Sequence, residues 1–489
     1  MSDTETSQIV ILGLGPGNPQ ALTLEAWEFI SQADKIYLRT ATHPTVQAFP
    51  TGLEIISFDS LYEAHDDFRE VYRQIIAHIL QAADENKQVL YAVPGHPYVA
   101  EATTPQIMKL AKEKGIAVKV VDGVSFLEPT FTALEIDPFP RLFVMDALEL
   151  SERLVPPFPV DVQVVVGQIY SKVIASQVKL SLMSVFPDEH PVKLVHGAGT
   201  AGMLVEQIPL YEIDRSSHIG NLTSLYLPPL EKKGSMEAFQ EIIARLRAPD
   251  GCPWDKEQTH RSLRPNLLEE TYEVLTAIDA GDEAAMCEEF GDLLLQIVLH
   301  AQIANEDGEF SLADVISGIH EEIVSRHPHV FGELDLDDAD GVIRNWEKLK
   351  AIERKKHGEE GKGLLGGVPV ALSALAQAET YQKRAARVGF DWKDIGGVID
   401  KVCEEVDEIR EAKTRDEKGW EIGDLLFSIV NLARWYKIDA ESVLREANAR
   451  FRERFTLVEA FAREDDRSIQ ELSLDEMEEY WQKAKKKCD

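Results

Sequence analysis

Short apolar runs alternate with amphipathic helical stretches over roughly the first half of the chain. Stretches 24–33 and 68–83 carry apolar residues at a helical period, and each strand-like run is followed by Gly or Pro. Loops at the carboxyl ends of strands are where α/β domains bind ligands. We therefore expect an N-terminal α/β domain with a ligand cleft. Its predicted strands are Ile9–Leu12, Val89–Ala92, Val118–Val121, Val162–Val166 and Val192–Val195.

The pattern changes after Leu227–Phe239, a segment with two prolines and a glycine that is typical of a linker. Beyond it the β-branched runs disappear and long amphipathic helices continue to the end of the sequence. A second break, His357–Pro369, divides this helical part. We expect three domains, covering residues 1–228, 235–357 and 364–489.

The two helical halves repeat each other. Leu267–Ile278 matches Val402–Ala412, and Glu288–Ala301 matches Trp420–Ala433. The offset is 135 residues between Glu270 and Glu405 and 132 between Asp292 and Asp424. So long a period indicates a duplicated domain rather than a solenoid.

Each half carries the acidic pattern EExxE followed by ExxD. Residues three or four apart share one helix face, and apolar stripes beside these positions must pack. Two antiparallel helices would therefore bring four carboxylates together in each half. The candidate ligands are Glu270, Glu273, Glu289 and Asp292 in the first half and Glu405, Glu408, Glu421 and Asp424 in the second.

Four gathered carboxylates need a cation. Two charges at about 4 Å repel by ~4 kcal/mol at an effective dielectric constant of ~20. Oxygen ligands without His or Cys favour Mg²⁺ or Mn²⁺. The alternative is a solvated acidic helix face, but such a face should carry interleaved Lys or Arg, and GDLL follows the second acidic pair in both halves.

The helical half resembles the MazG-type nucleoside triphosphate pyrophosphohydrolases. The likeness runs from about residue 236 to 485 and includes GCPWDKEQTH, RHPHVFG, QKRAARVGFDW and EANARFRERF. It implies two all-α domains, a homodimer, and hydrolysis of a nucleoside triphosphate to the monophosphate and pyrophosphate with Mg²⁺ or Mn²⁺. It also implies that the eight carboxylates are catalytic metal ligands, and that the substrate is contacted by Asn448, Arg450, Arg454, Arg326, Trp254 and Trp392.

The N-terminal half resembles the tetrapyrrole methylases, which bind S-adenosylmethionine between two α/β lobes. GLGPGN, VPGHPYVAEATTP, VDGVSFLEPTFTALEID, GQIY and HGAGT occur in that family's order, although Asn18 and His96 replace its usual acidic residues. The whole chain thus resembles YabN-type fusions of the two families. The implied S-adenosylmethionine contacts are Gly15, Pro16, Gly95, His96, Ser125, Phe126 and Gly199.

Two other functions remain open at this point. The chain could be an S-adenosylmethionine-dependent methyltransferase whose helical half serves for dimerisation, or its N-terminal half could be a non-catalytic sensor. No acceptor-site signature separates an active methylase from a binding domain.

Composition narrows the partners. Asp and Glu number 85 against 51 Lys and Arg, a net charge of −34, which disfavours nucleic-acid binding. The four cysteines form no CxxC pair, so we expect neither a disulfide framework nor a zinc site. The start has no signal-like character, and no apolar run is long enough to span a bilayer. We expect a soluble cytoplasmic protein.

Overall fold

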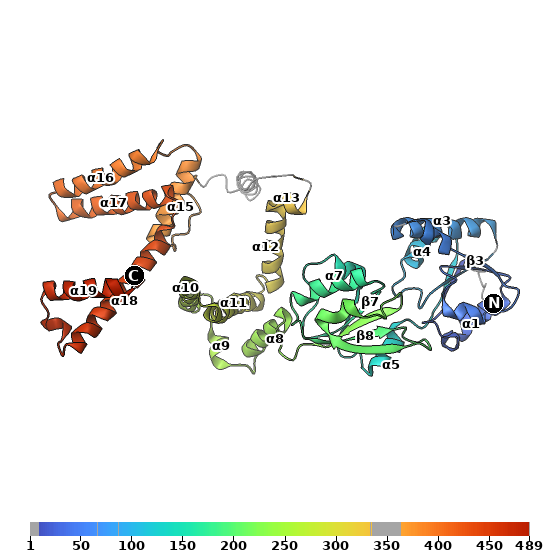
Figure 1. Ribbon diagram of the computed structural model, residues 1–489. Helices are drawn as coiled ribbons and strands as arrows, with labels where there is room; N and C mark the ends of the chain where they lie inside the picture. Colours follow the sequence, from blue (N-terminus) through green and yellow to red (C-terminus); the bar gives the residue numbers. More distant parts are fainter. Residues whose placement is uncertain (1–8, 66, 87, 333, 335–362, 489) are drawn as a thin grey trace. The chain divides into compact units, whose positions relative to one another are not determined.

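The computed structural model describes residues 9–65, 67–86, 88–332, 334 and 363–488 (Figure 1). The chain packs as two compact units, Met1–Lys256 and Glu257–Asp489, each considered separately below. The expected domain limits at residues 228, 235, 357 and 364 stay predictions, and residue 357 lies outside the described residues.

The first sheet of the N-terminal unit is fully parallel. Its order is β3-β2-β4-β1-β5, with each strand joined in register to its neighbours. Every residue of β1 and β4 is buried, which explains why both strands are continuous apolar runs rather than alternating ones. The strands are β1 (Ile9–Gly13), β2 (Lys35–Leu38), β3 (Glu54–Ser57), β4 (Val89–Val93) and β5 (Val118–Val121).

Alternate residues of β1 pack on opposite helices. Ile9 and Ile11 face α3 (Phe68–Glu85) and α4 (Thr103–Glu113), whereas Val10 and Leu12 face α1 (Leu24–Gln32). A short helix α2 (Asp59–Ala64) precedes α3. The sheet is therefore covered on both sides, as parallel sheets require.

The second sheet is mixed and has the order β6-β7-β10-β8-β9. Only β6 and β7 are parallel; β10 lies antiparallel between β7 and β8, and β9 pairs antiparallel with β8. The strands are β6 (Leu142–Asp146), β7 (Gln163–Gly167), β8 (Pro191–His196), β9 (Leu204–Pro209) and β10 (Thr223–Leu227).

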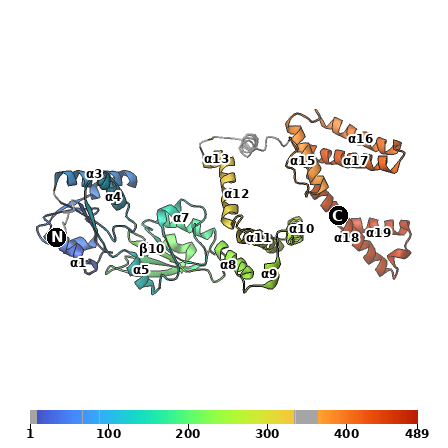
Figure 2. The same cartoon turned by 180° about the vertical axis from the view of Figure 1, so that it is seen from behind.

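Helices cover both faces of this sheet as well. Apolar residues of α7 (Lys172–Met183) and α6 (Ala147–Ser151) pack on one face and those of α5 (Leu127–Leu134) on the other. Figure 2 labels α7 and α5 on the two sides of β10. After β10 come α8 (Met236–Arg247), which belongs to the first unit, and the short α9 (Pro253–Glu257) at the division between the units. The predicted two-lobed α/β architecture is confirmed.

The second unit is helical throughout its described residues. Two helical hairpins carry the repeat: α10 (Arg264–Ala280) packs on α11 (Glu283–Glu306), and α16 (Ile395–Glu411) packs on α17 (Arg415–Trp435). The second hairpin is drawn in orange in Figure 1. The remaining helices are α12 (Leu312–Arg326), α13 (Pro328–Phe331), α15 (Ala374–Arg387), α18 (Ala440–Glu464) and α19 (Leu474–Cys488).

Local capping fixes where the helices with the ExxD positions begin. The Asp282 carboxylate accepts from the amides of Ala284 and Ala285 at the start of α11. Thr414 and Glu417 form a capping box at the start of α17. Each cap satisfies amides of the first turn and so fixes the residue at which its helix starts.

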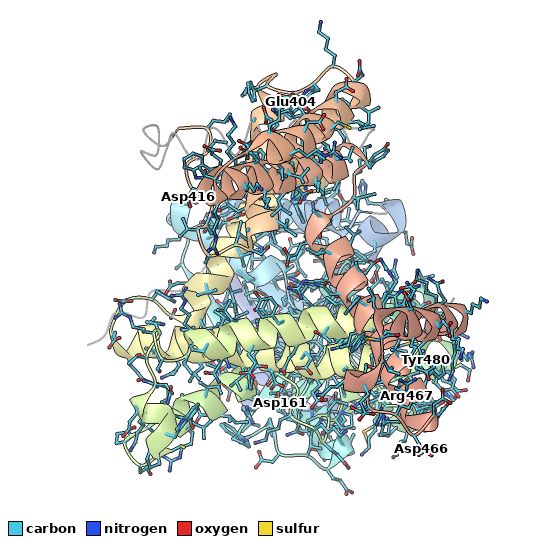
Figure 3. The ribbon with its side chains drawn as sticks, turned by 90° about the vertical axis from the view of Figure 1, so that its left-hand side faces the viewer. Asp161, Glu404, Asp416, Asp466, Arg467 and Tyr480 are labelled. Carbon is cyan, nitrogen blue, oxygen red and sulfur yellow. The ribbon has the colours of Figure 1, made fainter. Side chains whose placement is uncertain are left out.

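The end of the chain folds back on itself. Helices α18 and α19 share an apolar cluster that includes Val458 and Tyr480. Arg467 lies in the turn between the two helices and forms an ion pair with Glu476. Figure 3 labels Arg467 in this turn and Tyr480 on α19. Among the described residues, no helix combines the length and apolar character needed to cross a membrane.

Candidate functional site

Three carboxylates of the first hairpin converge. Glu270 and Glu273 on α10 and Glu289 on α11 each offer an oxygen, and these oxygens all lie within 4.8 Å of one another. Partial burial, followed by the negative charge of Asp292, raises the pKa of Glu270. Burial and the charge of Glu273 raise the pKa of Glu289. These carboxylates repel one another in the absence of a cation.

The second hairpin repeats the arrangement. Glu405 and Glu408 on α16 and Glu421 on α17 offer oxygens within 4.8 Å of one another. Burial, then the charges of Glu405 and Glu421, raise the pKa of Glu408. The structure thus brings together three of the four predicted ligands in each half. Asp292 and Asp424 lie outside these tight groups.

One cation distinguishes the second cluster from the first. Lys401 Nζ lies 2.8 Å from Glu405 Oε1 and 3.0 Å from Glu404 Oε1, and both contacts raise the pKa of Lys401. Figure 3 labels Glu404 on the outer side of α16. At the offset of the repeat, the first hairpin has the neutral Asn266 where the second has Lys401.

The donor set fits a hard divalent cation. Glu405 is only 3% exposed, and its Oε2 is buried with no hydrogen-bond partner within the described part of the chain. Lys401 compensates the charge of Glu405 in part through Oε1, and a divalent cation would also give Oε2 a partner. Carboxylate oxygens in sets of three, without His or Cys, match the ligands that Mg²⁺ and Mn²⁺ take.

A cavity of about 210 Å³ lies beside the second cluster. Its walls are mainly apolar and aromatic, and Lys401 joins it to the carboxylates. Gln382 is buried, donates from Nε2 to the carbonyl of Phe427 at 2.7 Å, and leaves Oε1 without a partner among the described residues. The lining includes Tyr381, Gln382, Phe390, Asp391, Trp392, Lys401, Phe427, Asn431 and Arg434.

The polar wall of this cavity is fixed by one aspartate. Asp391 Oδ1 accepts from Arg434 Nη2 at 2.7 Å and from Trp435 Nε1 at 3.1 Å. Burial opposes the charge of Asp391, but these hydrogen bonds outweigh it and lower its pKa. The cavity therefore combines stacking surfaces with polar groups held in place, which is suited to a planar heteroaromatic ring.

The predicted phosphate contacts have different surroundings. Arg450 is exposed on α18 and pairs with Glu446 at 3.4 Å, Asn448 is exposed nearby, and Arg454 is half-buried one turn beyond Arg450. Arg326 forms an ion pair with Glu322 at the end of α12. Trp254 on α9 is exposed and lines neither the cavity beside Lys401 nor the cavity of the first unit described below.

The first unit holds a second cavity, of about 150 Å³, between its two lobes. Four of the seven predicted S-adenosylmethionine contacts line it: Gly15, Pro16, Gly95 and Phe126. Gly15 and Gly95 both have positive φ and exchange backbone hydrogen bonds of 3.2 and 2.9 Å. The amides of these two glycines therefore hydrogen-bond to each other's loop.

The other three predicted contacts lie outside this lining. Ser125 is buried and donates to Glu128. Gly199 approaches Pro16 so closely that a Cβ would lie 2.7 Å from its Cγ. His96 Nε2 lies 3.5 Å from Asp122, so its ring is held to the β5 loop.

Sequence reasoning missed several lining residues. His43 is buried, its Nε2 lies 3.1 Å from the Gly15 carbonyl, and burial lowers its pKa. Its position just after β2 is the signal that could have found it. The residues from Asn221 to Ser224 also line the cavity, together with Gln168 and Ala198 from two of the quoted loops.

A buried ion pair supports the loop that follows β4. Arg39 Nη1 contacts the Glu101 carboxylate, and Arg39 also donates to the hydroxyls of Tyr62 and Tyr72, both at 2.9 Å. Burial, the largest single influence, opposes its charge, but Glu101 together with Tyr62 and Tyr72 outweighs that effect and raises the pKa of Arg39. Glu101 Oε1 accepts from the Thr103 amide at 2.7 Å. This network fixes the loop that carries Gly95.

Comparison with known proteins matches both units. Residues 8–214 match the model of the tetrapyrrole (corrin/porphyrin) methylases, and residues 258–331 match the MazG nucleotide pyrophosphohydrolase domain. Over 98% of both chains, the protein is 41% identical to the uncharacterized protein YabN of Bacillus subtilis.

Further relatives cover the helical half. A nucleoside triphosphate pyrophosphohydrolase/pyrophosphatase MazG of Thermotoga maritima is 45% identical over 51% of this chain and 95% of its own. A nucleoside triphosphate pyrophosphohydrolase of Escherichia coli is 43% identical over 50% and 95%. Among solved structures, a uroporphyrin-III-C-methyltransferase from Thermus thermophilus matches 45% of this chain and 94% of its own at 21% identity and a TM-score of 0.36.

Proposed function

The chain belongs to the family that joins a tetrapyrrole methylase domain to MazG nucleotide pyrophosphohydrolase domains, and from this membership we propose that it hydrolyses nucleoside triphosphates to monophosphates and pyrophosphate. The observation that carries the proposal is the pair of converging carboxylate clusters on α10–α11 and α16–α17. Bound Mg²⁺ would neutralise the triphosphate and lower the pKa of a water that attacks phosphorus.

The residues of the second hairpin have separate tasks in this proposal. Glu405, Glu408 and Glu421 hold the cation, and Asp424, one helical turn after Glu421, orients the outer ligands. The unpartnered Glu405 Oε2 is the atom with the most to gain from metal binding. Arg450 and Arg454 on α18 neutralise the departing pyrophosphate.

The cavity beside Lys401 binds the nucleobase in the same proposal. Trp392 and Phe390 provide apolar ring faces, and the free Gln382 Oε1 can accept from an exocyclic amino group. The first hairpin has its carboxylates but no Lys at the position of Lys401. We therefore assign the main activity to the second half.

The test is an assay of a nucleoside triphosphate panel with Mg²⁺, in which the products are identified. Release of pyrophosphate supports the proposal. The Glu270→Gln/Glu405→Gln double variant should lose the activity, and the control Glu321→Gln/Glu411→Gln, which alters exposed glutamates outside the clusters, should keep it. Full activity in the first variant would refute the proposal.

The interlobe cavity of the first unit supports a second role. We propose that it binds S-adenosylmethionine, because glycine loops, the buried His43 and the aromatic Phe126 line one cavity at the carboxyl ends of strands. Calorimetry with the full chain tests binding, and transfer of a labelled methyl group to an acceptor separates a methyltransferase from a sensor. Absence of binding removes both.

We also propose that the helical unit forms a homodimer. Large apolar side chains are exposed along its hairpins, including Tyr272, Phe290, Ile297, Ile422, Leu426 and Ile429. Exposed apolar faces of this extent mark association surfaces, and a second copy would cover them on both hairpins at once. Light scattering of the eluted full chain should give twice the mass of 54.8 kDa.

A further inference from the structure

Two histidines and a glutamate converge at one end of the second sheet. His196 ends β8, Glu206 lies on the neighbouring β9, and His218 follows the 3-10 helix Leu210–Arg215 that comes after β9. His196 Nε2 lies 2.8 Å from Glu206 Oε2, and His218 Nδ1 lies 3.0 Å from Glu206 Oε1. One ligand atom from each residue lies within 4.8 Å of the other two.

The ring of His196 is held from behind. Its second nitrogen, Nδ1, lies 3.1 Å from Thr223 Oγ1, and that oxygen also accepts from the Gly220 amide at 2.9 Å. A hydrogen bond from the second ring nitrogen is how proteins fix the orientation of a metal-binding imidazole. His196 is buried, whereas about half of the His218 side chain is exposed. The cluster is therefore anchored on one side and open to solvent on the other.

The chemistry of this cluster differs from that of the carboxylate groups. Two imidazoles and one carboxylate form the three-ligand set of open zinc sites, which leave a fourth position to water or another ligand. Ligands at ~2.1 Å around a tetrahedral ion lie about 3.4 Å apart. The two histidines contact different oxygens of Glu206, at 2.8 and 3.0 Å, and one ligand atom of each residue lies within 4.8 Å of the other two, so side-chain adjustment is enough to place all three around one ion. Mg²⁺ seldom takes nitrogen ligands.

We propose that His196, Glu206 and His218 form a binding site for a zinc-class divalent cation. The argument does not depend on nucleotide hydrolysis, because it uses only residues of the first unit. Cysteine spacing in the sequence argued against zinc, but this site uses no cysteine. The pairing of β8 with β9 brings His196 close to Glu206, and the segment after β9 adds His218.

A metal ion bound at this site would stabilise one wall of the interlobe cavity. Thr223, the partner of His196, lines that cavity, as does Ala198, two residues after His196. A bound ion would tie the segment containing His218 to β8 and β9 and so hold the cavity wall formed by residues 221–224. We expect ligand binding in the cavity to tighten when the ion is present.

The experiment measures Zn²⁺ bound per full-length chain after equilibration with excess Mg²⁺, which keeps the carboxylate clusters filled. One Zn²⁺ should remain, and Co²⁺ in its place should show the visible bands of a nitrogen-ligated ion of low coordination number. His218→Gln, at the exposed ligand, and the isosteric Glu206→Gln should each weaken binding by about 10- to 100-fold or more. The matched control is His320→Gln, an exposed histidine in α12.

The outcomes are distinct. Displacement of Zn²⁺ by Mg²⁺, or unchanged binding in both His218→Gln and Glu206→Gln, would overturn the site. A lower melting temperature of the variants with unchanged metal content would mean that the cluster is a hydrogen-bonded network only, and this result also overturns the proposal.

Discussion

The ammonium group of Lys401 lies one helical turn before the buried carboxylate of Glu405 and 2.8 Å from its Oε1. This contact partly neutralises the second acidic cluster before any divalent ion arrives. The first cluster has Asn266 at the matching position. The two copies of one helical hairpin therefore present the same ligands with different charge.

Removing Lys401 should expose this difference. In Lys401→Gln without divalent ions, Glu405 stays buried with no partner for its charge. We expect the free energy of unfolding to fall by about 1 kcal/mol, since Lys401 is about one-third exposed and its ion pair is screened. Mg²⁺ should restore the loss. Thermal melts with and without Mg²⁺ measure it, and Lys413→Gln, at an exposed lysine, is the control; an equal deficit in both conditions would contradict the role.

Single carboxylate variants should show which half is active. Glu405→Gln is expected to lower kcat by about 100-fold or more, the scale of removing one electrostatic catalyst, whereas Glu270→Gln should change it less than about 10-fold. Steady-state rates of pyrophosphate release measure both. The reverse order would place the main activity in the first hairpin.

Gly397 should be intolerant of a side chain. A Cβ there would lie 2.5 Å from Cδ1 of Trp392, so Gly397→Ala must displace the indole from the cavity wall. We expect KM to rise about fivefold, roughly 1 kcal/mol of lost aromatic contact. Gly419→Ala is the control, because its Cβ would meet nothing within 4 Å. Equal KM values in the two variants would exclude Trp392 from substrate binding.

A comparable pair of glycine variants tests ligand binding in the interlobe cavity. A Cβ on Gly167 would lie 2.8 Å from Cζ of Phe126, a lining residue, whereas a Cβ on Gly202 would meet nothing within 4 Å. Gly167→Ala should cost about 1–3 kcal/mol through overpacking and weaken S-adenosylmethionine binding about 10-fold. Calorimetry and thermal melts measure the two effects, and Gly202→Ala should leave both unchanged.

The turn between α18 and α19 gives a pH-dependent contribution to stability. Hydrogen bonds from Arg467 and then Ser473 lower the pKa of Glu476 from 4.5 to about 2. A carboxyl whose folded pKa is depressed stabilises the fold above its unfolded pKa, and this contribution is lost as the pH falls from 4.5 to about 2.

Glu476→Gln should therefore destabilise the chain at pH 7 and flatten the acid limb of its stability curve in that window. Denaturant melts across the pH series measure the effect. The matched control is Glu479→Gln, an exposed residue of α19 that should keep the limb.

Much of the helical half could be predicted because helical spacing alone decides which side chains share a face. To place the EExxE and ExxD carboxylates close together, it was enough to assume that the two helices of each half pack antiparallel. The cavity beside Lys401 could not be predicted in full, since Gln382 and Arg434 come from different helices whose packing the sequence does not specify.

The α/β half shows the complementary limit. The apolar runs identified β1, β4, β5, β7 and β8, but not β2, β3, β6, β9 or the central strand β10. They missed β9, whose residues are half-exposed with Glu206 and Gln207 in the middle, because an edge strand has no continuous apolar signal. Glu206, which lies on β9 and belongs to the proposed site with His196 and His218, therefore could not be predicted from the sequence.

The salt bridge between Arg39 and Glu101 restricts the movement of the Gly95 loop, which lines the interlobe cavity. A displacement of this loop would separate two opposite charges that are largely buried, and such a displacement is therefore energetically unfavourable. The wall of the cavity that the first lobe forms is therefore rigid, and any change in the shape of the cavity must come from the opposite wall.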